Sequence, residues 1–201
     1  MLGVVDGSRG VGVVGVSLGG SVALLAAAAD ERVACCAPLI GTQSLAYALK
    51  KKAFHARLDS FKGARKDVEG LAVAGEDDSL TAFDEAALSM RGNASKKDAA
   101  VVRSVLDAVA PGLLEHFDAD RVLPAIAPRP LRILNGERDP RCWLMGLAPA
   151  VAAAAPLYAS AGAADKFAVL AEVGVGHEHT RAMHASAMEL CRQTLLHTQQ
   201  Q

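Results

Sequence analysis

The sequence predicts an α/β protein with a mostly parallel sheet, flanking helices and a helical insertion. Short, continuously apolar runs rich in β-branched residues alternate with runs rich in alanine and leucine, as expected for parallel strands covered by helices on both faces. A more charged interval at 41–128 interrupts this alternation. The chain has 201 residues, of which 51% are hydrophobic and 21% charged. We therefore predict one domain over 1–201 with a helical insertion at 41–128.

The strands and helices are expected in a regular order along the chain. The first strand is "VGVVGVS", which ends at Ser17, and the helix "LGGSVALLAAAAD" follows because alanine and leucine are good helix formers. Further strands are expected at 32–40, 129–135 and 166–173, and further helices at 148–161 and 180–197. Right-handed crossovers would place these strands parallel in one sheet.

The insertion has helical periods in "LAYALKKKAFHARLDSF" and "DAAVVRSVLDAVAPGLLEHF". The piece between them, at 69–97, is weakly patterned and is predicted to be a loop. We expect the whole insertion to form a cap over the carboxyl edge of the sheet.

Charge and cysteine content limit the partners and the compartment. A net charge of -1 provides no field that would attract nucleic acid or an anionic membrane, so neither is predicted as a partner. The four cysteines lack metal-type spacing, and "VACCAPLI" predicts buried thiols in a reducing compartment. With no start segment that indicates export, we expect a cytoplasmic protein, or an organellar one if an upstream targeting peptide is missing.

The residues at 11–29 include no charged side chain, which allows a membrane span as an alternative. Four glycines and two serines dilute this run, and no second long apolar segment follows it. A strand followed by a buried helix therefore explains the run better.

The motif Gly15-Val16-Ser17-Leu18-Gly19 is G-x-S-x-G at the junction of the first strand and helix. This context is typical of a nucleophile elbow, in which side chains in place of the two glycines would collide with the neighbouring strand and helix. Ser17 is the candidate nucleophile. The N–H of Leu18, at the positive end of the helix, is the candidate oxyanion donor.

The glycines from Gly10 to Gly15 also fit G-x-G-x-x-G, the dinucleotide fingerprint. That fingerprint needs a helix that opens inside the motif and an acid at the end of the next strand. Here the glycines fall within the strand and the next strand ends without a carboxylate, so we predict no nucleotide cofactor.

A base and an acid follow the two later strands. The third strand is followed by "NGERDP" with Asp139, and the fourth by "GVGHEHT" with His177. The chain order Ser17, Asp139, His177 is the order of an α/β-hydrolase triad, and each residue follows the carboxyl end of a strand. Glu137 is the alternative acid, ranked below Asp139. The nearby histidines do not make H-E-x-x-H, so no metal is predicted.

"VGVVGVSLGGSVAL", "LPAIAPRPLRILNGERDPRC" and "GVGHEHT" resemble the α/β-hydrolase superfamily, in the branch of dienelactone-hydrolase-like esterases and prolyl-oligopeptidase-type peptidases, which includes plant-type α/β-hydrolase proteins. The resemblance implies a serine hydrolase of carboxylic esters or acyl compounds that needs no cofactor. It also implies several strands before the nucleophile strand and a second oxyanion donor from a loop among them.

Those strands are not found in this sequence, so we expect a partial α/β-hydrolase fold with an uncovered sheet edge. Such an edge leaves self-association open as a partner prediction. Two functions follow: a serine hydrolase that forms an acyl-enzyme on Ser17, or a catalytically incomplete module that binds a small molecule or partner.

Overall fold

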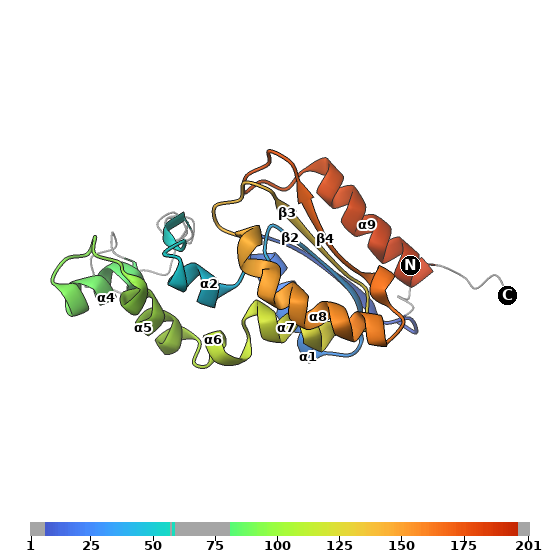
Figure 1. Cartoon of the computed structure of the whole chain (residues 1–201), viewed down its shortest axis with the longest axis horizontal. Coiled ribbons are helices and arrows are strands. Elements are labelled where there is room, and N and C mark those ends of the chain that lie inside the picture. The colour runs from blue at the N-terminus through green and yellow to red at the C-terminus, as the bar shows by residue number, and fades with distance from the viewer. Residues whose placement is uncertain (1–6, 57, 59–80, 197–201) are drawn as a thin grey trace, which may run out of the picture. The chain divides into compact units, whose positions relative to one another are not determined.

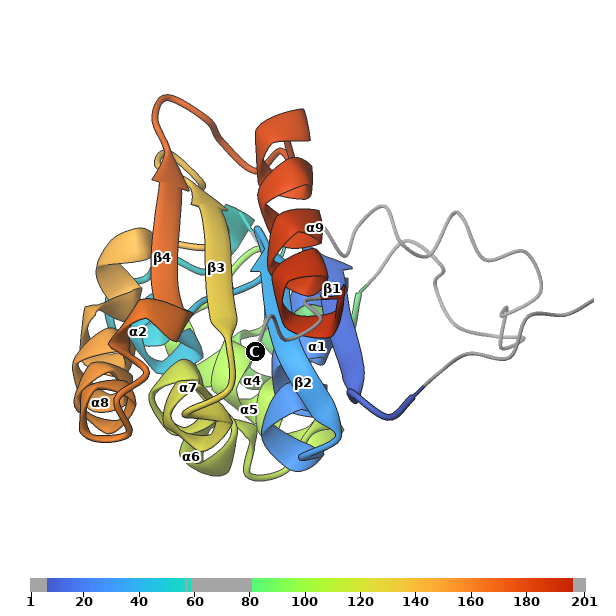
Figure 2. The ribbon, with the colours of Figure 1, turned by 90° about the vertical axis from the view of Figure 1, so that its right-hand side faces the viewer.

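The computed structural model describes residues 7–56, 58 and 81–196, and its core is a parallel sheet of four strands in the order β1-β2-β3-β4 (Figures 1 and 2). The strands are β1 (Val11–Val16), β2 (Val33–Leu39), β3 (Leu131–Gly136) and β4 (Phe167–Glu172). The helices packed with them are α1 (Leu18–Ala29), α7 (Ala119–Ile126), α8 (Ala148–Ser160) and α9 (Arg181–Leu196), with short 3₁₀ turns at Leu144–Leu147 and Ala164–Lys166. The predicted strands, helices and parallel pairing are confirmed.

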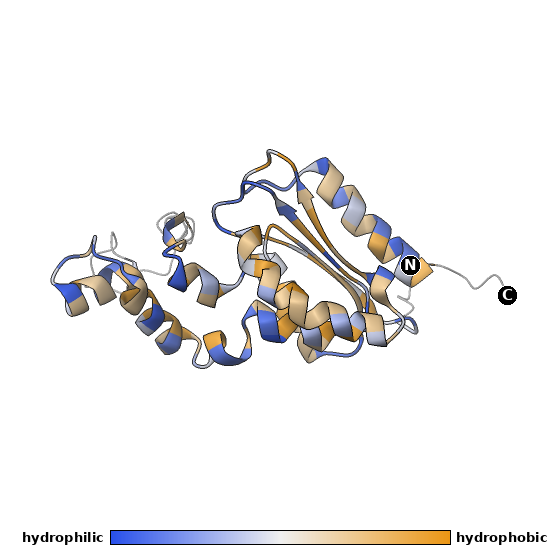
Figure 3. Cartoon of the chain, in the orientation of Figure 1, coloured by the Kyte–Doolittle hydropathy of each residue, from blue (hydrophilic) through white to orange (hydrophobic). Residues whose placement is uncertain are grey.

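Helices cover both faces of the sheet. Figure 2 shows α9 on one face and α1, α7 and α8 on the other. Along β2, Cys35, Ala37 and Leu39 pack with α9, whereas Cys36 packs into the core beneath α1, α7 and α8. This alternation explains why the β2 sequence is apolar at nearly every position, and the strands accordingly appear apolar in Figure 3.

The run at 11–29 forms β1 and α1, which confirms the prediction of a strand followed by a helix. Within the described part of the chain, no helix has the length and apolar character needed to cross a membrane.

Arg129 joins the amino end of β3 to the carboxyl end of α1. Its guanidinium donates to the carbonyls of Ala27 at 2.6 Å, Asp30 at 2.9 Å and Val33 at 2.8 Å. A cation is favourable at a helix carboxyl terminus, where backbone carbonyls lack partners. The hydroxyl of Tyr158 donates to the carbonyl of Arg129 itself at 2.7 Å, which attaches α8 to the same junction.

Strand β1 lies at one edge of the sheet, and among the described residues it pairs only with β2. Val11, Val14 and Val16 are 55%, 39% and 41% exposed. An apolar edge is thus present as predicted, while self-association through it stays a prediction.

The described residues between 45 and 116 form a second compact unit. The helices described in it are α2 (Leu45–Lys50), α4 (Ala82–Arg91), α5 (Ala99–Val109) and α6 (Leu113–His116). They enclose a small apolar cluster that includes Phe54, Phe83 and Val102. The cap role of the insertion at 41–128 stays a prediction, and α7, which falls within that range, packs with α1 and α8 in the sheet's unit.

Helix α4 corrects the prediction of a loop at 69–97, of which residues 69–80 lie outside the described residues. The helix begins with a capping box: the Thr81 side chain accepts from the Asp84 N–H, and the Asp84 carboxylate accepts from the Thr81 N–H at 2.8 Å. Lys97 forms an ion pair with the same carboxylate. The T-x-x-D signature of this cap was present in the sequence and identifies the helix start better than its weak periodicity does.

Candidate active site

Ser17 occupies the sharp turn between β1 and α1. Its backbone has φ 54° and ψ −118°, a region that residues with a side chain rarely adopt and that costs about 1–3 kcal/mol. Both backbone polar groups of Ser17 are hydrogen-bonded. Its N–H donates to the carbonyl of Leu39 in β2 at 2.8 Å, and its carbonyl accepts from the N–H of Gly20 at 2.9 Å. The strained turn predicted from the motif is therefore present.

The two motif glycines differ in what surrounds them. A Cβ at Gly15 would lie 2.0 Å from the carbonyl oxygen of Gly19 and 2.7 Å from the nitrogen of Gly20, so no side chain fits between strand and helix there. A Cβ at Gly19 would meet nothing within 4 Å outside its own helix. The expectation of a collision is right for Gly15 and wrong for Gly19, because only Gly15 faces the other element.

The structure brings the three predicted side chains together. Ser17 Oγ lies 2.9 Å from His177 Nε2, and His177 Nδ1 lies 2.8 Å from Asp139 Oδ2. The three residues follow β1, β3 and β4, whose carboxyl ends share one edge of the sheet. With its proton on Nδ1, the imidazole donates to the carboxylate and accepts from the serine hydroxyl.

The Asp139 side chain is fully enclosed, and both of its oxygens are engaged. Oδ1 accepts from the backbone N–H of Arg141 at 2.8 Å and of Cys142 at 3.1 Å, while Oδ2 faces His177. A buried carboxylate needs such partners. The two amides give Oδ1 its hydrogen-bond partners and thereby fix which oxygen is presented to the imidazole.

Two buried residues that were not predicted from the sequence, Asn135 and Cys142, support the loop that carries Asp139. Asn135, completely buried at the end of β3, donates through Nδ2 to the carbonyls of Thr42 at 3.1 Å and Cys142 at 3.4 Å. The Cys142 thiol donates to the carbonyl of Ile40 at 3.1 Å. The loop that holds Asp139 is thereby joined to the segment after β2. An amide that directly follows the apolar residues Ile133 and Leu134 at the end of the strand is the signal that could have identified Asn135.

The same segment after β2 packs against the serine turn. A Cβ at Gly41 would lie 2.4 Å from the Ser17 carbonyl oxygen, and the Ser21 hydroxyl donates to the Gly41 carbonyl at 2.7 Å. The Ser17 turn and the Asp139 loop are thus both anchored to one segment, which fixes the distance between them.

Leu18 is the first residue of α1, so its backbone N–H belongs to the first turn, where amides lack helical partners. The first turn carries no acidic side chain that would oppose an anion. Leu18 is 62% exposed beside Ser17. The position therefore suits a donor to a developing negative charge.

Glu137, the alternative acid, has another role, and the other histidines near His177 lie on the surface. The Glu137 carboxylate accepts from the Gly174 N–H at 2.8 Å and so holds the loop that precedes His177. His179 and His184 are exposed. Among the described residues, one group has metal-ligand character: Asp139, Cys142 and His177, whose ligand atoms lie within 4.8 Å of one another. These atoms are already engaged in the hydrogen bonds given above.

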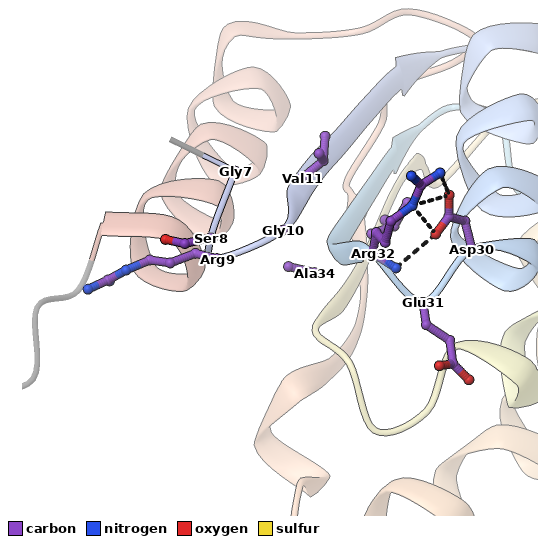
Figure 4. Close-up of a pocket in the computed structure, with 10 residues that line it drawn as sticks. Gly7, Ser8, Arg9, Gly10, Val11, Asp30, Glu31, Arg32 and Ala34 are labelled. Atoms are coloured by element: carbon purple, nitrogen blue, oxygen red, sulfur yellow. Dashed lines mark hydrogen bonds and ion pairs between the residues drawn. The ribbon is translucent and has the colours of Figure 1, made fainter. Parts of the chain in front are cut away.

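Of the glycines in the competing nucleotide motif, Gly15 belongs to the serine turn, whereas Gly10 and Gly12 lie at the amino end of β1. A hollow there is lined by the turn at Gly7–Val11 and by Asp30, Glu31 and Arg32 (Figure 4). Arg32 pairs with Asp30 through hydrogen bonds of 2.7–3.1 Å and holds the pKa of that carboxyl down at about 2. No helix begins inside the motif, so the requirement for a phosphate-binding turn is not met.

Comparison with known proteins identifies the fold. No protein-family profile and no curated sequence matches the chain. Similar solved structures include a carbohydrate esterase family 15 glucuronoyl esterase from Caldicellulosiruptor kristjansonii (23% identity, 92% of this chain and 43% of that one, TM-score 0.51). A second is a glucuronoyl esterase from Solibacter usitatus (17% identity, 93% of this chain and 43% of that one, TM-score 0.51). A third is a 2,6-dihydroxy-pseudo-oxynicotine hydrolase (21% identity, 92% of this chain and 40% of that one, TM-score 0.50).

At these identities the likeness shows the fold alone. The chain has a partial α/β-hydrolase fold and spans less than half the length of these three structures.

Proposed function

We propose that this chain is a serine hydrolase that cleaves a carboxylic ester or related acyl compound through an acyl-enzyme on Ser17. One observation carries the proposal: the continuous contact from Ser17 through His177 to Asp139, with distances of 2.9 and 2.8 Å. This is the arrangement in which a base activates a hydroxyl and is itself oriented by a third group. The hydrolases among the similar structures agree with it.

In the acylation step, His177 Nε2 takes the proton of Ser17 Oγ as this oxygen attacks the carbonyl carbon of the substrate. The imidazolium that forms is stabilised by Asp139, which remains a carboxylate. The Leu18 N–H donates to the oxygen that becomes negative. His177 then returns the proton to the leaving alcohol, and the acyl group stays on Ser17.

In the deacylation step, water attacks the acyl-enzyme while His177 accepts its proton. Collapse of the second tetrahedral intermediate returns the proton to Ser17 and releases the acid.

A fluorophosphonate probe tests the proposal because it traps an activated serine without any knowledge of the substrate. We expect one adduct on the folded wild type, mapped to Ser17, and none on Ser17→Ala. Ser160→Ala is the matched control, since Ser160 is an exposed serine in α8 whose hydroxyl donates to the Leu157 carbonyl of its own helix at 3.0 Å. If the folded wild type stays unlabelled, the proposal fails and the non-catalytic binding module becomes the better account.

The substrate class is tested with p-nitrophenyl esters of increasing acyl length beside a peptide anilide. Hydrolysis of an ester that Ser17→Ala does not hydrolyse would support an esterase. Cleavage of the anilide alone would contradict it.

A further inference from the structure

We propose that Cys35 and Cys191 form a dithiol that a two-electron oxidant such as hydrogen peroxide closes to a disulfide, which joins the sheet to α9. Their sulfur atoms lie 3.9 Å apart although the residues are separated by 156 positions in the sequence. A disulfide bond is about 2.0 Å long, so rotation of the two side chains with a small approach of the helix would close it.

The surroundings hold the two thiols against each other. Cys35 points from β2 toward the face that α9 covers, where Cys191 packs against the same apolar cluster. Gly12 lies opposite Cys35 in the β1–β2 register. A Cβ at Gly12 would lie 3.1 Å from each sulfur and 3.2 Å from a Leu195 methyl, so the bare glycine leaves the space that the sulfurs occupy.

The two cysteines differ in their exposure. Cys35 is fully buried, whereas Cys191 is partly exposed, so an oxidant reaches Cys191 first. Burial, together with the neighbouring Cys191, raises the pKa of Cys35 to about 11, which keeps it a thiol at neutral pH. Cys191 is therefore the attacking group and Cys35 the resolving group.

The chemistry balances with peroxide as the oxidant. The Cys191 thiolate attacks one peroxide oxygen, the O–O bond breaks, and a sulfenic acid forms at Cys191 while hydroxide leaves and takes up a proton as water. The Cys35 thiol then gives its proton to the sulfenic hydroxyl as its sulfur attacks the Cys191 sulfur, and that hydroxyl leaves as a second water molecule. Two thiols are oxidised to one disulfide, and one peroxide is reduced to two waters.

The other two cysteines do not share this arrangement. Cys36 is buried on the opposite face of the sheet, in the core beneath α1, α7 and α8. Cys142 is buried after β3 and donates its thiol hydrogen to the Ile40 carbonyl. The reaction is therefore specific to one pair, and it does not depend on the proposed hydrolase activity.

The test is oxidation of the folded, fully reduced wild type with hydrogen peroxide. After quenching and unfolding, we expect the free thiols to fall from four to two and the intact mass to drop by two hydrogen atoms. A non-reducing digest should contain one linked peptide pair, which joins Cys35 to Cys191. The oxidised protein should also unfold at a higher temperature than the reduced protein, because the cross-link restricts the unfolded chain.

Cys191→Ser, at the partly exposed position, should abolish the link, while Cys142→Ser should retain it. The wild-type peptide map decides the question even where a variant fails to fold. The proposal is overturned if the folded wild type keeps four thiols, if Cys191 proceeds to sulfinic acid without a link, or if the link forms only in denaturant.

Discussion

The substitution Gly15→Ala should disrupt the serine turn, whereas Gly19→Ala should not. The added methyl at Gly15 would lie 2.0 Å from the Gly19 carbonyl oxygen, while ordinary contacts begin at 3.4 Å. Strand β1 and helix α1 must therefore separate by about 1.4 Å, and a shift of about 1 Å at a reacting group costs about 100-fold in rate. Overpacking of this kind also lowers the free energy of unfolding by about 1–3 kcal/mol.

At Gly19 the same methyl meets open space within a helix. Alanine there should raise the free energy of unfolding by roughly 0.5–1 kcal/mol, because glycine loses more backbone entropy on folding.

Urea unfolding and the rate of fluorophosphonate labelling measure the two effects side by side. We expect Gly15→Ala to be less stable and labelled at least about 100-fold more slowly, and Gly19→Ala to be slightly more stable and still labelled. Equal behaviour of the two variants, or a Gly15→Ala protein that matches the wild type, would refute the argument that close approach at Gly15 shapes the turn.

Three further predictions concern side chains. Asp139→Asn should slow labelling by about 10,000-fold with little loss of fold, since an amide cannot stabilise the charged His177; a labelling rate near wild type would contradict this. Arg129→Met should lower the free energy of unfolding in urea by about 2 kcal/mol because buried carbonyls lose a charged donor; an unchanged midpoint would show that water replaces it. Desolvation raises the pKa of Asp84, but the hydrogen bonds from Lys97 and Thr81 outweigh this effect and bring the pKa down from 3.8 to about 2. The stability that this carboxylate supplies is therefore complete above pH 3.8 and is lost as the pH falls toward 2. Urea unfolding across that range should show the loss in wild type and a weaker loss in Asp84→Asn.

The sheet and the three candidate residues were predictable because their signals are local. A continuous apolar run predicts a buried parallel strand, as "VACCAPL" does for β2, and G-x-S-x-G predicts a turn. Residues after parallel strands must lie at the carboxyl-end edge of the sheet, so Ser17, Asp139 and His177 were expected there. Strand order does not bring them into contact, because β1 and β4 are the outermost strands and the loop after β4 has to carry His177 to Ser17.

The supports of the site were not predictable in the same way. Asn135 and Cys142 act through contacts with Thr42 and Ile40, about a hundred positions away in the sequence, and no local pattern announces such a contact. Helix α4 was wrongly predicted to be part of a loop for the opposite reason: its signal was local, but a side-chain cap marks the start of the helix and periodicity does not.

The sequence alone predicts which residues form strands, which turn carries the serine, and the order of the candidate acid and base. These features depend on neighbouring residues and on the two-residue and 3.6-residue periods of strand and helix. The folded structure was needed to show that Gly15 and not Gly19 has to lack a side chain, which oxygen of Asp139 faces the imidazole, and that Cys35 lies beside Cys191. Those facts depend on distances between segments that are remote in the sequence, and packing sets such distances to within a fraction of an ångström.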